Sequence, residues 1–257
     1  MGVIRFNFLS KELGMQTNVS ICIPTFSFAD MYNNRTEVYV PGMKFQVLYL
    51  LHGGSGDDSD FIHFSNIVRY ADENKVAVVM PCDYNACYTD APDGPKYYSY
   101  LVEELPRVCA SMFPISDKRE DTFIGGLSMG SHGAMKIAMN YPERFAAALF
   151  MSGASFRPGV PTFVPTKDGI FDLETPPQQL PFNSVGDKLQ DPEYIKGTVN
   201  DVFAIARRYR RGKIIQVESR TVDHRIGRGR TEQTERRSVK SSKHLAVNAD
   251  IAHHSRS

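Results

Sequence analysis

The residues of this chain that could perform chemistry centre on a serine between two glycines. Gly126, Ser128 and Gly130 form a G-x-S-x-G pattern in a chain of 257 residues. The apolar segment Thr122–Ile124 has the character of a buried strand, and a helical pattern starts at Ser131, so Ser128 falls at a turn from strand to helix. A serine in such a turn projects its hydroxyl into a cleft, where it can attack an acyl carbonyl. The pattern predicts that Ser128 is a catalytic nucleophile; the alternative is an idle serine in a glycine-rich turn.

A second glycine-rich loop could stabilise the negative oxygen that such an attack creates. It begins with His52 and Gly53 after the apolar segment Phe45–Leu51, and it lacks the G-x-x-x-x-G-K-S/T pattern of a phosphate-binding loop. We expect the backbone N–H groups of Gly54 and Met129 to form an oxyanion hole. His52 could be mistaken for the catalytic base, but its place before the glycines favours a structural role.

Strands and helices alternate around these two loops. Strand-length apolar runs, each followed by Gly or Pro, occupy Phe45–Leu51, Val76–Met80, Thr122–Ile124 and Ala147–Met151. Between them, Tyr97–Phe113 and Ser131–Asn140 show helical periodicity. This alternation predicts an α/β fold, with a mostly parallel sheet covered by helices on both faces. The segments Val3–Leu9 and Thr17–Ile23 differ, because they are typical of an antiparallel hairpin at the edge of the sheet.

Residues 155–195 form an irregular, proline-rich segment. Seven of the 15 prolines lie there, and the segment shows little periodicity. Because proline removes backbone donors and fixes backbone angles, we expect a lid-like insertion that covers the Ser128 cleft and sets acyl or alcohol preference. A helix is expected to follow over Thr198–Arg211.

Composition changes abruptly after residue 212. Residues 213–257 contain no Phe, Tyr, Pro, Met or Cys, and they carry ten basic residues against five acidic ones. We therefore expect one folded α/β domain over residues 1–212 and a separate basic tail that is disordered or read out of frame. Without the last strands the sheet would expose an apolar edge, through which the chain could form homo-oligomers.

Charge and cysteine usage exclude several classes of partner. The net charge is +1, so the whole chain offers no strong field for nucleic acid or an anionic membrane. No apolar stretch approaches a membrane span and no signal sequence is evident, which predicts a cytoplasmic protein. The four cysteines form no C-x-x-C pair, so we expect small buried hydrophobic side chains, and neither a disulfide nor a metal site.

Several separated motifs, in a fixed order, resemble one branch of the α/β-hydrolases. They are VLYLLHGGSG at 47–56, YSYLVEELP at 98–106, FP at 113–114 and TFIGGLSMGSHG at 122–133. The chain is similar in these segments to the tributyrin esterase and esterase D group, which includes acetyl and feruloyl esterases. The resemblance covers about residues 1–212. It implies a cofactor-free serine carboxylesterase for a small-molecule ester with a short or sugar-linked acyl group, with Ser128 as nucleophile and Gly54 and Met129 as oxyanion donors.

The resemblance stops before the other catalytic residues. The group carries a C/V-G-x-x-D segment that supplies the triad acid and an H-E-W-like segment that supplies the base, and neither occurs after residue 212. The alternative is that the C-terminal segment has diverged but still completes the triad. Asp223 would then be the acid and His253 or His254 the base, in the order Ser, Asp, His. We expect instead that residues 213–257 do not complete a triad, which would make activity poor or absent.

Two other functions remain open from the sequence. The same nucleophile and oxyanion hole would serve a thioesterase of the S-formylglutathione hydrolase type. A catalytically inactive protein could instead use the basic tail to bind polyanions, although no aromatic residue lies between the charges to stack on bases.

Overall fold

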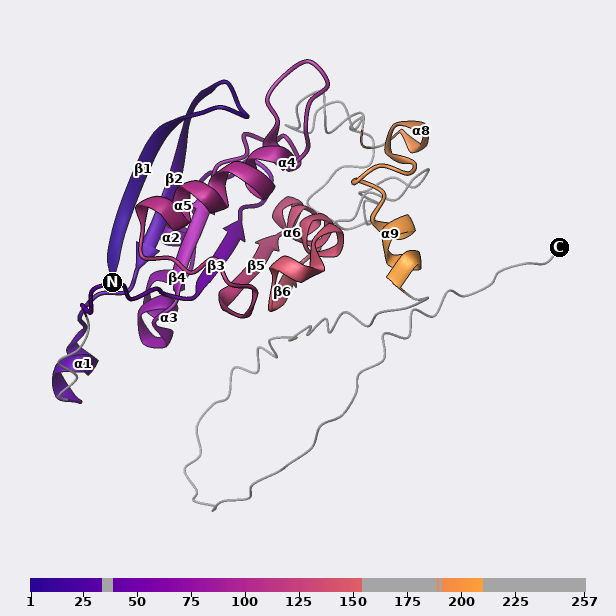
Figure 1. The fold of residues 1–257 in the computed structure, drawn as a ribbon. Helices are drawn as coiled ribbons and strands as arrows, with labels where there is room; N and C mark the ends of the chain where they lie inside the picture. The colour runs from indigo at the N-terminus through magenta and orange to yellow at the C-terminus, as the bar shows by residue number, and fades with distance from the viewer. Residues whose placement is uncertain (34–38, 154–188, 190, 210–257) are drawn as a thin grey trace, which may run out of the picture. The chain divides into compact units, whose positions relative to one another are not determined.

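The computed structural model describes residues 1–33, 39–153, 189 and 191–209, and within them one six-stranded sheet positions the site (Figure 1). The strand order is β1-β2-β4-β3-β5-β6. The strands are β1 (Gly2–Ser10), β2 (Met15–Ile23), β3 (Val47–Leu51), β4 (Ala77–Pro81), β5 (Thr122–Leu127) and β6 (Ala147–Met151). Strand β3 pairs in parallel with β4 and β5, β5 pairs in parallel with β6, and β2 runs antiparallel to β1 and β4. The predicted parallel strands and the antiparallel hairpin at the edge are confirmed.

The predicted helices between the strands are also confirmed. The helical elements are α1 (Phe28–Tyr32), α2 (Asp60–Phe64), α3 (Ile67–Asn74), α4 (Tyr97–Ser99), the π-helix η1 (Tyr100–Glu104), α5 (Leu105–Met112), the 3-10 helices η2 (Arg119–Asp121) and η3 (Pro142–Arg144), α6 (Met129–Asn140), α8 (Pro192–Ile195) and α9 (Val202–Tyr209). The helix expected over Tyr97–Phe113 is α4, η1 and α5 in direct succession. The helix expected from Ser131 begins two residues earlier, immediately after Ser128.

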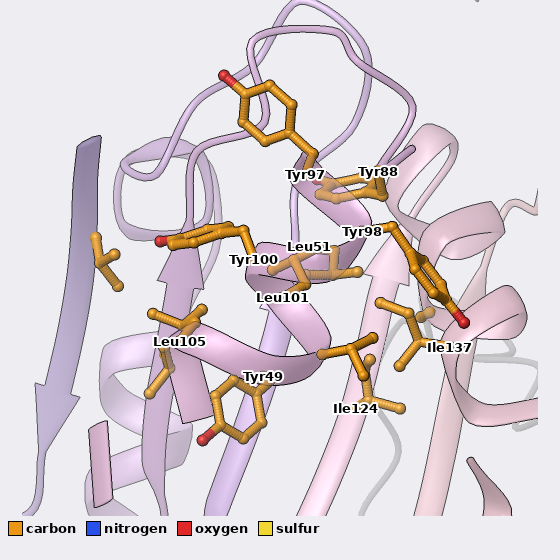
Figure 2. Close-up of a cluster of buried hydrophobic side chains, with 14 of the residues drawn as sticks. Tyr49, Leu51, Tyr88, Tyr97, Tyr98, Tyr100, Leu101, Leu105, Ile124 and Ile137 are labelled. Carbon is orange, nitrogen blue, oxygen red and sulfur yellow. The ribbon is translucent and has the colours of Figure 1, made fainter. Parts of the chain in front are cut away.

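Alternating side chains of the central strands form an apolar core on each face of the sheet. Tyr49 and Leu51 of β3 pack with η1, α5 and α6 in one core (Figure 2), whereas Leu50 packs with α3 in the other. Helices therefore cover both faces, as predicted. All four cysteines are free and buried, as expected, and burial raises the pKa of the Cys109 thiol to about 12.

The turn between β1 and β2 is held by a carboxylate from a distant helix. Glu104, at the end of the π-helix, accepts hydrogen bonds from the Lys11 N–H at 2.7 Å, the Glu12 N–H at 3.1 Å and the Ser10 hydroxyl at 2.5 Å. A π-helical turn widens the backbone spiral and changes the direction in which its side chains point. Glu104 thus replaces the water that would otherwise satisfy two backbone amides of the turn.

The helix expected over Thr198–Arg211 begins four residues late. The Thr198 hydroxyl bonds the Ile195 carbonyl at 2.7 Å, which holds this stretch in a turn. The carboxylate of Asp201 then accepts the Ala204 N–H at 2.8 Å and so caps α9. These local side-chain hydrogen bonds hold the first four positions of the expected helix in a turn, so the helix starts after them.

Some expectations fall outside the described residues. Most of the lid-like segment 155–195 does, but its end forms α8, and both Leu189 and Ile195 are buried in the core. The basic tail 213–257 lies wholly outside, together with Asp223, His253 and His254. None of the helices that the structure describes is long and apolar enough to cross a membrane.

Candidate active site

Ser128 occupies a strained position between β5 and α6. Its backbone has φ 53° and ψ −113°, a conformation that costs a residue with a side chain about 1–3 kcal/mol. The Ser128 N–H donates to the Met151 carbonyl at the end of β6, at 2.9 Å, which fixes the turn against the neighbouring strand. The predicted strand-to-helix turn is therefore present, and the strain is the kind that accumulates at functional positions.

The two glycines of the pattern allow the backbone around Ser128 to pack closely. A Cβ atom on Gly126 would lie 2.2 Å from the Gly130 carbonyl carbon, and one on Gly130 would lie 2.1 Å from the Leu51 carbonyl oxygen. Both distances are far below contact, and the atoms met are backbone atoms that cannot rotate away. Glycine is therefore required at both positions, which explains the spacing on either side of the serine.

The loop after β3 lies directly beside Ser128. A Cβ atom on Gly53 would be 3.7 Å from the Ser128 Cβ, so the segment containing Gly54 is adjacent to the serine. On the other side Met129 is the first residue of α6, where a backbone N–H has no partner within the helix. The structure thus brings together Ser128 and the two segments that carry the predicted oxyanion donors, Gly54 and Met129.

An asparagine that the sequence analysis missed holds this loop. The Asn85 side-chain oxygen accepts the Ser55 N–H at 2.7 Å, and both residues have left-handed backbones, with φ 65° at Ser55 and 63° at Asn85. The bond ties the residue after Gly54 to the loop that follows β4. An asparagine within a turn-rich segment carries no sequence signal for such a long-range contact.

His52 has both ring nitrogens engaged. Its Nε2 accepts the Asp83 N–H at 2.9 Å, so Nδ1 carries the proton and donates to the Gly53 carbonyl at 2.7 Å. Burial lowers the pKa of His52, which keeps the ring neutral. These contacts support the structural role expected for His52, because a ring held in this way cannot exchange a proton with Ser128.

A buried lysine on α6 links the site to its surroundings. Lys136 Nζ donates to the Tyr88 carbonyl at 2.6 Å, the Thr89 hydroxyl at 2.7 Å and the Asn200 side-chain oxygen at 2.9 Å. Burial lowers the pKa of Lys136 to about 8, so the amine is still mostly protonated at pH 7. The Tyr88 hydroxyl in turn donates to the His52 carbonyl at 2.8 Å. One continuous set of bonds therefore connects the helix after Ser128 with the glycine loop.

The described residues supply no acid or base for Ser128. Among them, no group hydrogen-bonds the Ser128 hydroxyl, and the candidates Asp223, His253 and His254 lie outside. His132, on the first turns of α6, is fully buried, and burial together with the nearby Lys136 charge lowers its pKa well below the usual value. In this part of the chain no three His, Cys, Asp or Glu side chains gather so as to hold a metal ion.

We expect the buried His132 to make stability depend on pH. Its pKa is lowered in the folded state, so the unfolded chain takes up the proton first as the pH falls below about 6.5, and stability is lost. The stability advantage of the native protein over His132→Leu should shrink by about 1.4 kcal/mol between pH 7.5 and 5.5, measured by urea denaturation. Using a difference removes the contribution of the buried Asp83 carboxyl, whose raised pKa acts in the opposite direction.

Ile137 offers a matched control for this measurement, because it lies on the same helix, is buried and carries no titratable group. The difference between the native protein and Ile137→Val should be the same at both pH values. A His132→Leu difference that does not change with pH would show that the buried ring does not carry this dependence.

The chain is similar to a family of known proteins and to several of its members. A family model named Esterase, described as "Putative esterase", matches residues 29–168. An acetyl esterase of Caldicellulosiruptor saccharolyticus is 34% identical over 155 residues, 60% of this chain and 57% of that protein. An S-formylglutathione hydrolase of Mus musculus is 29% identical over 138 residues, 43% of this chain and 48% of that protein. The chain thus spans about half the length of these curated relatives.

A solved structure shows the same architecture. FphF, a fluorophosphonate-binding serine hydrolase of Staphylococcus aureus, matches with a TM-score of 0.59 and 28% identity. The match covers 81% of this chain and 73% of that one. The expected α/β-hydrolase fold is thereby confirmed.

Proposed function

Since this chain belongs to the Esterase family, we propose that it is a serine carboxylesterase for small esters that carry either a short acyl group or an acetyl or feruloyl group linked to a sugar. The observation that carries the proposal is the strained Ser128 turn with the Gly53 loop beside it. Strain, close glycine packing and an adjacent glycine-rich loop are the features that expose a nucleophilic serine and place an oxyanion hole beside it.

In the proposed reaction the Ser128 oxygen attacks the ester carbonyl carbon. The carbonyl oxygen becomes negative and accepts hydrogen bonds from the Gly54 and Met129 amides, aided by the positive end of α6. The carbon–oxygen bond to the alcohol breaks, the alcohol leaves with a proton, and Ser128 holds the acyl group. Water then attacks the acyl carbon, the acid departs, and Ser128 regains its proton.

Turnover depends on groups that accept and return the serine proton. We expect that residues 213–257 do not complete a triad, and without a base the serine hydroxyl is largely unactivated. Turnover should then stay below about 1 s⁻¹, the low end of ordinary enzymes.

The relatives favour an oxygen ester over a thioester. The acetyl esterase is more similar and matches more of this chain than the S-formylglutathione hydrolase does. The test is to incubate the full chain with p-nitrophenyl acetate, methyl ferulate, an acetylated xylose and S-formylglutathione. Hydrolysis of an oxygen ester above background supports the proposal. Faster hydrolysis of the thioester, or no hydrolysis and no covalent labelling of Ser128 by a phosphonate, contradicts it.

We expect Asn85 to position the proposed oxyanion loop. Asn85→Gly keeps the left-handed backbone accessible but removes the acceptor of the Ser55 N–H, so the loop beside Gly54 loses an anchor. The rate of phosphonate labelling at Ser128 should fall about 10-fold, less than the loss of an oxyanion donor itself. Mass spectrometry over a time course measures the rate.

Asn66 provides a matched control for this effect. It precedes α3, and its side chain forms no capping hydrogen bond there. Asn66→Gly should label at the native rate. Equal labelling rates for the native protein and Asn85→Gly would show that Asn85 does not position the loop.

A further inference from the structure

The outer edge of β1 has no neighbouring strand among the residues that the structure describes. Within this part of the chain β1 is the outermost strand of the sheet, and it pairs with β2 alone (Figure 1). A strand in this position presents a row of unpaired backbone N–H and C=O groups, with which the strand of another chain can pair. The edge lies on the other side of the sheet from β5 and β6, where Ser128 is located.

Strand β1 lacks the features by which proteins usually protect such an edge. Natural edge strands are often short or bulged, or they carry proline and charged residues. In contrast, the nine residues of β1 pair one to one with nine residues of β2, without a bulge. Their sequence, GVIRFNFLS, contains no proline and a single charged residue, Arg5. The edge is therefore open to pairing along its whole length.

Several apolar side chains of β1 are exposed to solvent. Val3 is 50% exposed, Ile4 37% and Leu9 67%. On the face of the sheet that α5 covers, the rings of Phe6 and Phe8 stack with 5.1 Å between their centroids, and both are only partly buried. A strand paired with the outer edge of β1 would cover part of this apolar surface, and its burial would favour association.

The residues of β1 are arranged symmetrically about Phe6 by their chemical character. When two copies of the strand pair antiparallel about a two-fold axis at Phe6, Val3 lies opposite Leu9 and Ile4 lies opposite Phe8. Residues directly opposite each other point to the same face, so each of these apolar side chains meets another apolar side chain. The strand is thus complementary to a second copy of itself, as a two-fold interface requires.

The one charged residue distinguishes this register from its neighbours. With the axis at Phe6, Arg5 lies opposite the neutral Asn7, and Asp58 lies 3.9 Å from the arginine. With the axis at Arg5, the two arginines would lie opposite each other, and like charges in this position are destabilising. With the axis at Asn7, Arg5 would lie opposite the apolar Leu9. The register centred on Phe6 is therefore favoured.

We propose that this chain forms a two-fold symmetric dimer in which the β1 strands of two copies pair antiparallel about Phe6. The two sheets then join into one continuous sheet across the axis. The proposal is independent of the esterase activity, because β1 contributes no residue to the Ser128 turn or to the Gly53 loop.

Pairs of charges across the axis test this register. Val3→Glu and Leu9→Lys each place a charge opposite an apolar residue of the other copy, so each should weaken dimerisation about 10-fold or more. The double variant that combines them places opposite charges across the axis twice, and it should dimerise more tightly than either single variant. Positions 3 and 9 of one chain lie roughly 20 Å apart, so this recovery must come from the other copy. Sedimentation velocity of the full chain at a series of micromolar concentrations measures the dissociation constants.

Cysteine cross-linking is a second measure of the register. Val3→Cys and Leu9→Cys should each form little disulfide-linked dimer when oxidised alone, because each position faces the other one across the axis and not itself. An equimolar mixture of the two variants should form a disulfide-linked dimer, which a non-reducing gel detects. The four native cysteines are buried and so should not contribute.

Val199→Glu is the matched control for the charged variants. Val199 is 39% exposed and lies shortly before α9, which packs against α6. This variant should dimerise as the native protein does. Four results would each overturn the proposal: a native chain that stays monomeric, equal weakening by Val199→Glu and Val3→Glu, a double variant that dimerises less tightly than both single variants, or a single cysteine variant that cross-links as readily as the mixture.

Discussion

Ser128→Ala removes covalent labelling by a fluorophosphonate and any ester turnover above background. The strained turn presents this one hydroxyl, and loss of a catalytic nucleophile typically costs about 10⁴- to 10⁶-fold in turnover. Intact-protein mass spectrometry should find one phosphonate per native chain, on the peptide that contains Ser128, and none on the variant. Labelling of the native protein should be slow, because no described group activates the hydroxyl.

Ser131 is the matched control, since it lies three residues after Ser128, within α6, and is fully buried. Ser131→Ala should be labelled like the native protein. Labelling that survives Ser128→Ala would defeat the assignment of the nucleophile. Native turnover well above about 1 s⁻¹ would leave Ser128 in place but refute the expectation that the tail lacks a base.

Gly130→Ala should destabilise the fold by at least about 3 kcal/mol. The new methyl group would lie 2.1 Å from the Leu51 carbonyl oxygen, 2.6 Å from the Leu51 carbonyl carbon and 2.6 Å from the His52 carbonyl oxygen. Helix α6 can relieve the overlap only by moving away from β3, which disrupts packing on one whole face of the sheet. Urea denaturation followed by circular dichroism measures the loss, and failure to recover folded protein is its extreme form.

Gly53→Ala is the control, because its methyl group would meet only ordinary contacts, at 3.5 and 3.7 Å. Its free energy of unfolding should stay close to that of the native protein. A Gly130→Ala variant with native stability would show that α6 does not depend on this close approach.

The parts of the fold that could be predicted were those with a local signal. Val47–Leu51 is apolar at successive positions, and such a run bounded by turns specifies a strand buried on both faces. Strand β5 was expected to end at Ile124 but continues to Leu127, because pairing with β3 and β6 extends it through two glycines. The residues of one segment do not indicate which strands will pair with it. The end of a strand is therefore harder to predict than its existence.

The parts that could not be predicted depend on contacts between distant residues. Asn85 and Lys136 act on segments that are 30 or more residues away, and nothing in their own neighbourhood indicates it. Ser128, by contrast, could be predicted from its neighbours, because the glycines that its turn requires lie two residues before and after it in the sequence.

The carboxylate that holds the β1–β2 turn also bears on how the chain folds during synthesis. The hairpin leaves the ribosome before the helix that holds its turn, and the Ser10 hydroxyl meets Glu104 only after 94 more residues have been added. At ordinary translation rates that interval is roughly 5 to 20 s. Throughout it the turn amides stay hydrated and the apolar face of the hairpin has no helix against it. A nascent chain of this protein therefore presents an unprotected two-stranded edge for seconds, which is the kind of surface that chaperones bind.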